Sequence, residues 1–260
     1  MISFLRSPLA AAGAFALCVA AAPAAAPEAR VAIDPAQLPA PQRIVVPKLE
    51  GAVVVDGELN EPVWAQAAVL GPFVPHSGSG QAREATVVRA WYDTTALYLG
   101  WTCTDADIQA TFTARDSKFW EEEVVEFFVT RRDLAQYFEL QWNPLGGVFD
   151  AIIRNTLDAR GVSRSTKGDW SFTAKGMRSA VKVRGTVGNS ADRDERWQVE
   201  VVIPFADLGE ATPQPGDVWR ANFYRFNRTK DLPVEMLAWS APVLPGFHQP
   251  SRFGHLEFGR

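Results

Sequence analysis

One glutamate, Glu126, interrupts an apolar run of the chain at Glu123–Val129, and Trp120 precedes it by six positions. An ionised carboxylate among apolar side chains must be paired or hydrogen-bonded, because burying a bare charge is costly. One interpretation is a structural ion pair with an arginine from a neighbouring strand. The other is a polar anchor at the floor of a ligand cleft, with Trp120 as one wall of that cleft.

Paired carboxylates also carry out glycoside hydrolysis, which gives a second hypothesis for the same glutamates. Such an enzyme needs two carboxyl groups on one side of a cleft, roughly 5–9 Å apart. Glu126 would act with one of Glu121 to Glu123 or with Glu139. Adjacent residues of a strand point to opposite faces, so the cluster before Glu126 is more often a solvated loop. The sequence therefore favours a site without catalytic residues and keeps hydrolysis as an alternative.

Metal and cofactor chemistry has few candidate ligands. Haem ligation, a third hypothesis, needs a methionine and a histidine or two histidines. The candidates are Met177, Met236, His76, His248 and His255. The sequence has no CxxCH haem-attachment motif, HExxH zinc motif, phosphate loop or GxSxG elbow. The turns Asp105–Asp107 and Asp192–Asp194 offer carboxylates for calcium, but this pattern is more often a solvated turn, so no metal ligand is assigned.

Strands must position these residues, because no segment shows a long apolar period of 3.6 residues. β-branched and aromatic residues make Glu123–Val129 a strand, and its two apolar faces place it in the middle of a sheet. The segment Tyr137–Asn143 alternates, with Glu139 and Gln141 on one face and apolar residues on the other. Both glutamates of interest thus lie within predicted strands.

Further predicted strands are separated by turn signals along the rest of the chain. Thr86–Tyr92 and Leu97–Thr104 form an antiparallel hairpin. The others are Val53–Val55, Val148–Arg154, Val181–Val187, Trp197–Ile203, Trp219–Asn227, Leu237–Ser240 and Phe253–Phe258. This pattern predicts an all-β fold, an antiparallel β-sandwich of the immunoglobulin or jelly-roll kind with short helical turns.

Three irregular segments complete the prediction. A short helical turn follows Asn60 as its N-cap, with Trp64 packed on the core, and another begins at Pro204. Arg154–Lys175 is polar and predicted to be a loop, and it contains Trp170.

Composition limits the classes of partner. The 260 residues are 47% hydrophobic and 11% aromatic, which is enough to build a core. A net charge of −4 argues against nucleic acid or an anionic membrane surface as a partner. Nine tryptophans exceed the usual number for this length, and large flat side chains suit a binding surface. We expect a monomer.

The first residues have the regions of a signal peptide. Arg6 is the positive residue, Leu9–Ala22 the apolar stretch, and Ala22-Pro23-Ala24 the small-x-small cleavage site within residues 1–26. Residues 27–43 form an Ala/Pro-rich leader, and residues 44–260 form the folded domain. We expect a secreted or periplasmic protein that is free of the membrane after cleavage. Cys103 would then be the one remaining cysteine, which excludes an intrachain disulfide.

Five segments together resemble a carbohydrate-binding module of family 9, in the wider group of DOMON-like sandwiches. They are Val55–Trp64, Trp91–Leu99, Trp120–Phe128, Trp197–Phe205 and Phe247–Leu256, in the family's order. The resemblance covers roughly Lys48 to Phe258, and its motifs are specific as a set rather than singly.

The resemblance implies a sugar held between two aromatic rings, with polar side chains on its hydroxyl groups. Trp120 matches the first aromatic residue of this clamp, and Phe247 falls where the family has a second tryptophan. Glu126 matches the family's carboxylate six residues after the first aromatic. Glu139 stands in place of the family's arginine on the next strand, which changes the charge offered to a ligand.

Gln141 and Tyr224 lie near further polar ligand positions of the family, and His248 lies beside the second aromatic residue. A pyranose has an apolar C–H face and a polar rim, so aromatic walls and polar groups suit it. The resemblance thus implies a secreted, non-catalytic carbohydrate-binding protein that serves polysaccharide catabolism. Family members can carry structural calcium, but no residue match assigns such a site here.

Overall fold

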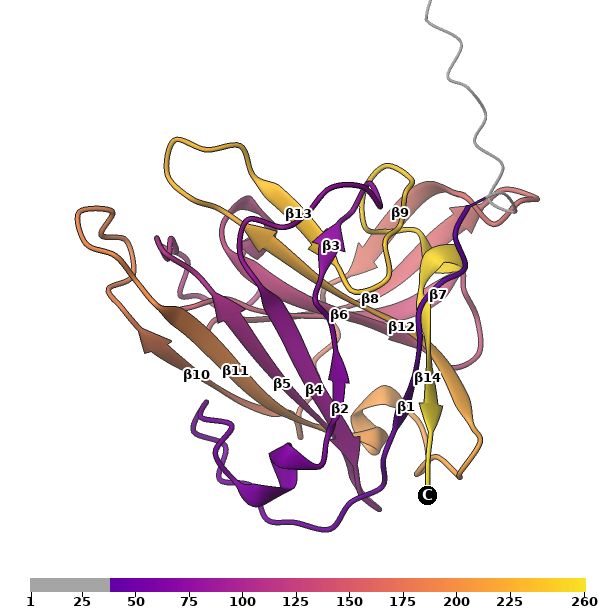
Figure 1. The fold of residues 1–260 in the computed structure, drawn as a ribbon. Coiled ribbons are helices and arrows are strands. Elements are labelled where there is room, and N and C mark those ends of the chain that lie inside the picture. Colours follow the sequence, from indigo (N-terminus) through magenta and orange to yellow (C-terminus); the bar gives the residue numbers. More distant parts are fainter. Residues whose placement is uncertain (1–37) are drawn as a thin grey trace, which may run out of the picture. The chain divides into compact units, whose positions relative to one another are not determined.

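The computed structural model describes residues 38–260, and the structural statements below concern that range. The predicted signal peptide and most of the predicted leader lie outside it. The described chain forms two β-sheets that face each other, as Figure 1 shows, so the predicted sandwich of mainly antiparallel strands is confirmed. No helix in the described range is long and apolar enough to cross a membrane.

The larger sheet has nine strands, and its main path runs β1-β14-β12-β6-β7-β8-β9, with β13 and β3 beside β12. Its strands are β1 (Arg43–Val46), β3 (Val74–Pro75), β6 (Val124–Thr130), β7 (Gln136–Trp142), β8 (Val148–Leu157), β9 (Ser163–Asp169), β12 (Val218–Asn227), β13 (Glu235–Ala238) and β14 (Gly254–Phe258). Neighbours are antiparallel except β1 and β14, which are parallel. Strand β6 lies mid-sheet between β12 and β7, as its two apolar faces predict.

The smaller sheet has five strands in the order β10-β11-β5-β4-β2. These strands are β2 (Ala68–Leu70), β4 (Thr86–Tyr92), β5 (Ala96–Thr104), β10 (Arg178–Arg184) and β11 (Arg196–Pro204). The predicted hairpin is β4 and β5, with Thr86 opposite Cys103. Short 3-10 helices lie at η2 (Pro62–Ala65), η3 (Phe119–Glu121), η4 (Phe205–Leu208) and η5 (Pro250–Arg252).

The main core fills the space between the two sheets. Every second residue of β6 points into it, including Val125 and Phe127, because side chains alternate along a strand. Trp101 of β5 meets Trp142 of β7 with ring centroids 5.3 Å apart. Cys103 is buried in this core as a free thiol. The other residues of β6, Glu126 among them, therefore face away from the smaller sheet.

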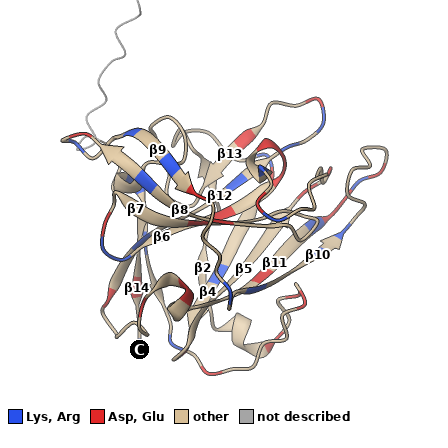
Figure 2. Ribbon diagram, turned by 180° about the vertical axis from the view of Figure 1, so that it is seen from behind, with Lys and Arg blue, Asp and Glu red and all other residues tan. Residues whose placement is uncertain are grey.

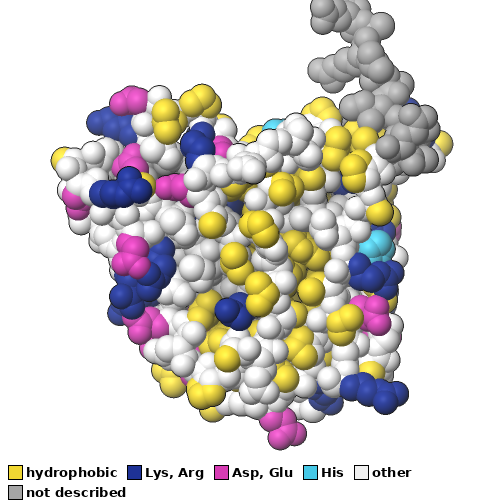
Figure 3. Space-filling model, viewed as in Figure 1, with side chains coloured by type: hydrophobic (Ala, Val, Ile, Leu, Met, Phe, Trp, Pro, Cys, Tyr) yellow, Lys and Arg dark blue, Asp and Glu magenta, His cyan; other side chains and the backbone are white. Residues whose placement is uncertain are grey.

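Charged side chains lie mainly outside this core. Figure 2 shows lysine and arginine beside aspartate and glutamate along loops and strand ends, with both signs present on the side viewed. Figure 3 shows hydrophobic side chains across the middle of the opposite view, while charged ones gather along the edge near β10.

Three local predictions are wrong. Val53–Val55 is not a strand, because the Glu61 carboxylate accepts the Val54 N–H at 2.9 Å in place of a strand partner, and Val54 is 69% exposed. Helix η2 begins at Pro62 with Glu61 at the N-cap position, since proline suits the first helical turn, so Asn60 is not the cap.

The third wrong prediction concerns the segment from Arg154 to Lys175. It contains the end of β8 and the whole of β9, which is hydrogen-bonded to β8 on one side only. Most of β9 is exposed, and its residues are polar, so its composition resembled that of a loop. An edge strand needs no apolar face where no second layer covers it.

Candidate functional site

A pocket of about 380 Å³ opens on the outer face of the nine-stranded sheet, the face turned away from the main core. Side chains of β6 to β9, β12 and β13 form it, together with the Trp120 turn and the loop before η5. Its lining residues are Trp120, Glu126, Glu139, Phe149, Ile153, Thr166, Gly168, Trp170, Phe226, Met236, Gly246, Phe247 and His248. Four of the six residues predicted to bind ligand are among them.

Three aromatic rings form one wall of the pocket. Trp120, Phe149 and Trp170 meet edge to face, with centroid distances of 5.4 to 5.8 Å. Trp120 is half-buried, whereas Trp170 is 45% exposed. An exposed tryptophan beside a half-buried one leaves apolar ring surface open to a ligand.

Trp170 lies directly over the backbone of Gly168. A Cβ atom at Gly168 would come within 2.5 Å of the indole Nε1. The glycine of β9 thus allows the indole to lie close against the strand, and any side chain there would displace it.

The turn that carries Trp120 is fixed by hydrogen bonds from Arg228 and by the packing of Phe119. Arg228 donates from Nη2 to the Trp120 carbonyl at 2.9 Å and from Nε to the Glu122 carbonyl at 3.1 Å. Phe119, on the other side, is fully buried against Gly147, where a Cβ atom would come within 2.5 Å of its ring. Trp120 is therefore positioned by its backbone as well as by its ring contacts.

Phe247 lies on the opposite part of the lining and is only 3% exposed. Its ring stacks on Tyr224 at a centroid distance of 4.1 Å and contacts Phe226 at 4.9 Å. The structure thus shows the Phe247 side chain packed rather than exposed. One face of the ring is occupied by Tyr224, so Phe247 offers less open ring surface than Trp170.

Glu126 and Glu139 form the acidic part of the lining. Register pairs Glu126 with Gln141 and Phe128 with Glu139, so the two glutamates are diagonal neighbours on one face. Such neighbours lie about 7–8 Å apart between backbone positions. The residues are 2% and 4% exposed.

The environment of this pair disfavours two negative charges. Burial raises the pKa of Glu126 well above its ordinary value, and the charge of Glu139 adds to the shift. Burial also raises the pKa of Glu139 to about 8, against the hydrogen bond from Gln141, which lowers it. No charged donor is recorded on either carboxylate among the described residues, so the pair retains a proton at neutral pH.

Gln141 and Tyr224, also predicted to bind ligand, lie behind the lining. Gln141 is fully buried and donates from Nε2 to Glu139 Oε1 at 2.5 Å. Tyr224 is fully buried, accepts from Asn222 at 2.8 Å and donates to the Phe247 carbonyl at 3.0 Å. In this structure both support lining residues rather than face the pocket.

His248 contributes the remaining polar group. Its Nδ1 is 2.6 Å from the Tyr137 hydroxyl, and its ring stacks on Phe128 at 5.2 Å. Burial lowers the pKa of His248 to about 4, so the ring is neutral at pH 7. With the Tyr137 hydroxyl as donor to Nδ1, the proton of the ring is on Nε2, which then serves as a donor.

The buried arginine of the neighbouring strand does not pair with Glu126. Arg225 of β12 lies opposite Val125 and faces the main core, where it contacts Asp105 at 2.8 Å and Glu123 at 3.6 Å. Glu126, one residue further along β6, faces the other side. The structural ion-pair interpretation therefore holds for Glu123 and is wrong for Glu126.

The other candidate carboxylates have structural partners. Glu122 accepts from the backbone of Thr111 and Phe112 at 2.7 and 3.0 Å, which ties the preceding loop to the Trp120 turn. Glu121 is 53% exposed and lies 3.7 Å from Lys118. For hydrolysis this leaves Glu126 and Glu139 as the glutamates that share the pocket.

Metal ligation finds little support in the described range. No three His, Cys, Asp or Glu side chains within residues 38–260 are grouped so as to hold a metal ion. Of the calcium candidates, Asp105 pairs with Arg225, and Asp194 accepts backbone N–H groups from Ile108 and Thr186. For haem, Met236 and His248 line the same pocket, whereas the other candidate ligands do not.

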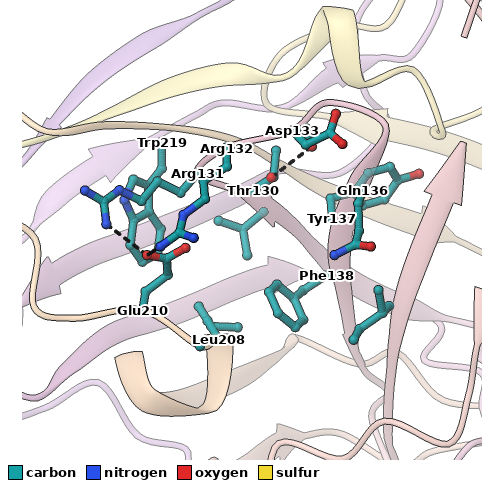
Figure 4. Close-up of a pocket in the computed structure, with 13 residues that line it drawn as sticks. Thr130, Arg131, Arg132, Asp133, Gln136, Tyr137, Phe138, Leu208, Glu210 and Trp219 are labelled. Atoms are coloured by element: carbon teal, nitrogen blue, oxygen red, sulfur yellow. Dashed lines mark hydrogen bonds and ion pairs between the residues drawn. The ribbon is translucent and has the colours of Figure 1, made fainter.

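A second pocket of about 350 Å³ lies at the ends of β6, β7 and β12 beside η4. Figure 4 shows its two arginines directed at Glu210. Arg131 and Arg132 approach that carboxylate at 2.9 and 3.3 Å. The aromatic residues that line this pocket are the buried Tyr137 and Trp219 and the half-buried Phe138, none of them as exposed as Trp170. Because the charges also satisfy one another, the pocket with Trp120 is the better ligand site.

Comparison with known proteins identifies a family and a fold. The sequence profile of carbohydrate-binding family 9 matches residues 84–258. No curated protein sequence matches the chain. A putative carbohydrate-binding protein from Bacteroides uniformis has a similar structure, with a TM-score of 0.65 and 18% identity over 84% of this chain and all of that one.

Two further solved structures are of a family 9 carbohydrate-binding module from Caldicellulosiruptor kristjanssonii. The complex with glucose gives a TM-score of 0.58 and 18% identity over 84% of this chain and 97% of that chain. The complex with cellotriose gives 0.57 and 16% over 84% and 95%. At these identities the similarity establishes the fold.

Proposed function

Because the chain belongs to carbohydrate-binding family 9, we propose that it binds a carbohydrate in the pocket lined by Trp120, Glu126 and Trp170. The observation that supports this most is an open aromatic wall next to a buried carboxylate without a hydrogen-bond donor. The aromatic rings suit the C–H face of a pyranose, and the carboxylates suit its hydroxyl groups. The relatives named above, crystallised with glucose and with cellotriose, support a sugar of that kind.

The proposed ligand is an oligosaccharide or polysaccharide, and the protein serves polysaccharide catabolism without cleaving a bond itself. We further propose that the chain is exported, as a secreted or periplasmic monomer, on the basis of its signal-peptide pattern. The wider DOMON-like relationship rests on the sequence resemblance.

A glycan array on the mature protein, run with and without calcium, tests the function. Calorimetry on the strongest hit then compares wild type with Trp120→Ala, which should weaken binding at least tenfold, or about 1.4 kcal/mol. Phe172→Ala is the control, because Phe172 is a half-buried aromatic outside the pocket that packs on Phe138. Unchanged affinity in Trp120→Ala would show that the sugar binds elsewhere.

Hydrolysis is a second candidate, favoured by the shared face of Glu126 and Glu139. The register makes them diagonal neighbours that line one pocket, and two carboxyl groups on one side of a pocket are what a glycosidase needs. A raised pKa suits a general acid. Release of reducing sugar from array hits, abolished by Glu126→Gln, would establish an enzyme; no release leaves the binding function.

Haem binding has one supporting observation, the presence of Met236 and His248 in one pocket. The anionic propionates of haem would, however, share that pocket with two carboxylates. A visible spectrum of protein from haem-replete cells tests whether haem is bound. We expect no Soret band.

A further inference from the structure

The carboxylates of the pocket lack a positive partner. Glu126 is 2% exposed, lines the pocket and accepts no recorded hydrogen bond from any residue in the range 38–260. Glu139 accepts one bond, from the neutral amide of Gln141. Buried acceptors are rarely left unsatisfied, so an unpaired carboxylate facing a pocket indicates a donor supplied by a ligand.

The groups around this pair do not supply a positive charge. Burial, together with the nearby carboxylates, raises the pKa of Tyr137 and of Tyr224, so both phenols stay neutral. His248 is also neutral, because burial lowers its pKa to about 4. Arg228 adjoins the aromatic wall, but its guanidinium donates to the carbonyls of Trp120 and Glu122. None of the thirteen lining residues, all within the described range, is lysine or arginine.

The aromatic side chains of the lining add to this preference for positive charge. Trp120, Trp170, Phe149, Phe226 and Phe247 line the same pocket as the carboxylates. The Arg228 guanidinium already lies over the Phe226 ring, 5.9 Å from its centroid, so the two tryptophans are the rings of most interest. The face of an aromatic ring attracts cations, most strongly for tryptophan. The pocket thus combines an aromatic enclosure with two acids, an arrangement that selects a ligand with an apolar body and one positive group.

We propose that this pocket selects a sugar carrying a free, protonated amine, a 2-amino-2-deoxyhexose or its oligomers, and that Glu126 and Glu139 bind the ammonium group. The proposal rests on the proposed carbohydrate function and narrows its ligand class. An ammonium group has three donors and no acceptor, so it can satisfy both carboxylates at once. A hydroxyl group at the same position donates one bond and brings no positive charge to this acidic pair.

Three trimers that differ only at carbon 2 test the proposal: cellotriose, its 2-amino counterpart and its 2-acetamido counterpart. Calorimetry is run at about pH 7, where an α-amino group with a pKa of about 7.7–8.0 is still largely protonated. The proton that the carboxyl pair retains is released as the ammonium group binds. We expect the amino trimer to bind at least tenfold more tightly than the other two. The preference should shrink in high salt, because salt screens charge interactions.

Variants identify the groups responsible. Glu139→Gln and Glu126→Gln should each reduce the preference for the amino trimer several-fold, since glutamine keeps the shape and removes the charge. Glu121→Gln is the matched control, because Glu121 lies in the Trp120 turn but outside the pocket and is 53% exposed. Circular dichroism and melting temperature establish that each variant is folded.

The outcomes separate this proposal from the function on which it rests. Binding of cellotriose as tight as or tighter than that of the amino trimer would overturn the amine preference and leave carbohydrate binding intact. The absence of binding to all three trimers and to every array glycan would overturn both. A preference for the amine that both glutamine variants retain would also contradict the assignment to Glu126 and Glu139.

Discussion

Glu139 of β7 and Glu126 of β6 are diagonal neighbours on the outer face of the larger sheet, and both carboxyl groups line one pocket without a positive partner. Strand alternation gives each of them this face, while Arg225 on the neighbouring strand faces the opposite side. The fold thus buries two acidic groups next to each other at a cost in stability, and the pair retains a proton at neutral pH. Such a cost is typical of sites that bind a ligand.

The first prediction concerns stability and pH. Burial raises the pKa of Glu139 to about 8, whereas an unfolded glutamate titrates at about 4.3. The folded protein therefore keeps a proton that the unfolded chain has lost, and the contribution of this group to stability falls as the pH rises through this window.

The substitution Glu139→Gln removes this loss of stability at high pH, because glutamine does not titrate. Its melting temperature should equal that of wild type near pH 4.5 and exceed it near pH 8. The gain there is on the order of 1–2 kcal/mol, or about 2–8 °C for a domain of this size. Thermal melts across this pH range measure it, with Glu121→Gln as the control that should follow wild type. A variant that is less stable than wild type at pH 8 would contradict the raised pKa.

The second prediction concerns Gly168. Because a Cβ atom would come within 2.5 Å of the Trp170 indole, Gly168→Ala should displace that ring and weaken sugar binding about tenfold. The strand itself should persist, since β9 is an edge strand with an exposed surface. Titration calorimetry and melting temperature check the two effects. Ser165→Ala is the control for a substitution in β9, since Ser165 is exposed and lies outside the pocket. Undiminished binding in Gly168→Ala would exclude Trp170 from the site.

The third prediction concerns the support of Trp120. Arg228→Lys keeps the charge but cannot donate to the carbonyls of Trp120 and Glu122 in the same forked geometry. We expect affinity for sugar to fall about three- to tenfold, or on the order of 1 kcal/mol, with a smaller effect on the melting temperature. Lys230→Arg, at an exposed neighbouring position, should leave affinity unchanged. Equal affinities in Arg228→Lys and wild type would show that the turn needs no such support.

The fourth prediction separates the core from the site. Arg225→Met would leave Asp105 and Glu123 buried without their partner. Removing one member of a buried ion pair typically costs about 3–5 kcal/mol. Chemical denaturation should show a loss of this size, while at low temperature the folded fraction still binds sugar. A loss below about 1 kcal/mol would contradict the role assigned to this pair.

The position of a residue could be predicted from the sequence where that position follows from the alternation of side chains along a strand. The apolar run around Glu126 predicted a mid-sheet strand, and the alternation of the next strand predicted that Glu139 and Gln141 share a face. Trp120, six positions before Glu126, lies in the short helix η3 that precedes this strand. These relationships depend on local periodicity, which the sequence contains.

Relationships set by packing between distant segments were harder to predict. Whether Phe247 is exposed depends on Tyr224, twenty-three positions away in the chain and stacked on it at 4.1 Å. The sequence shows Trp170 as a tryptophan in a polar segment. Its place in the aromatic wall of the pocket depends on β9, and the polar composition of β9 led to the prediction of a loop there. An isolated tryptophan in a polar segment, next to a glycine-containing strand edge, was the signal that pointed to it.

The most direct test of the binding site uses the indole N–H signals of the protein. The chain has nine tryptophans, of which Trp120 and Trp170 line the pocket. Nuclear magnetic resonance on protein labelled at the indole nitrogens, with signals assigned by single Trp→Phe variants, follows each one as the best-binding trimer is added. We predict that the signals of Trp120 and Trp170 shift with saturation while those of the fully buried Trp91 and Trp101 remain in place. Saturable binding that leaves both Trp120 and Trp170 unshifted would contradict the proposed site.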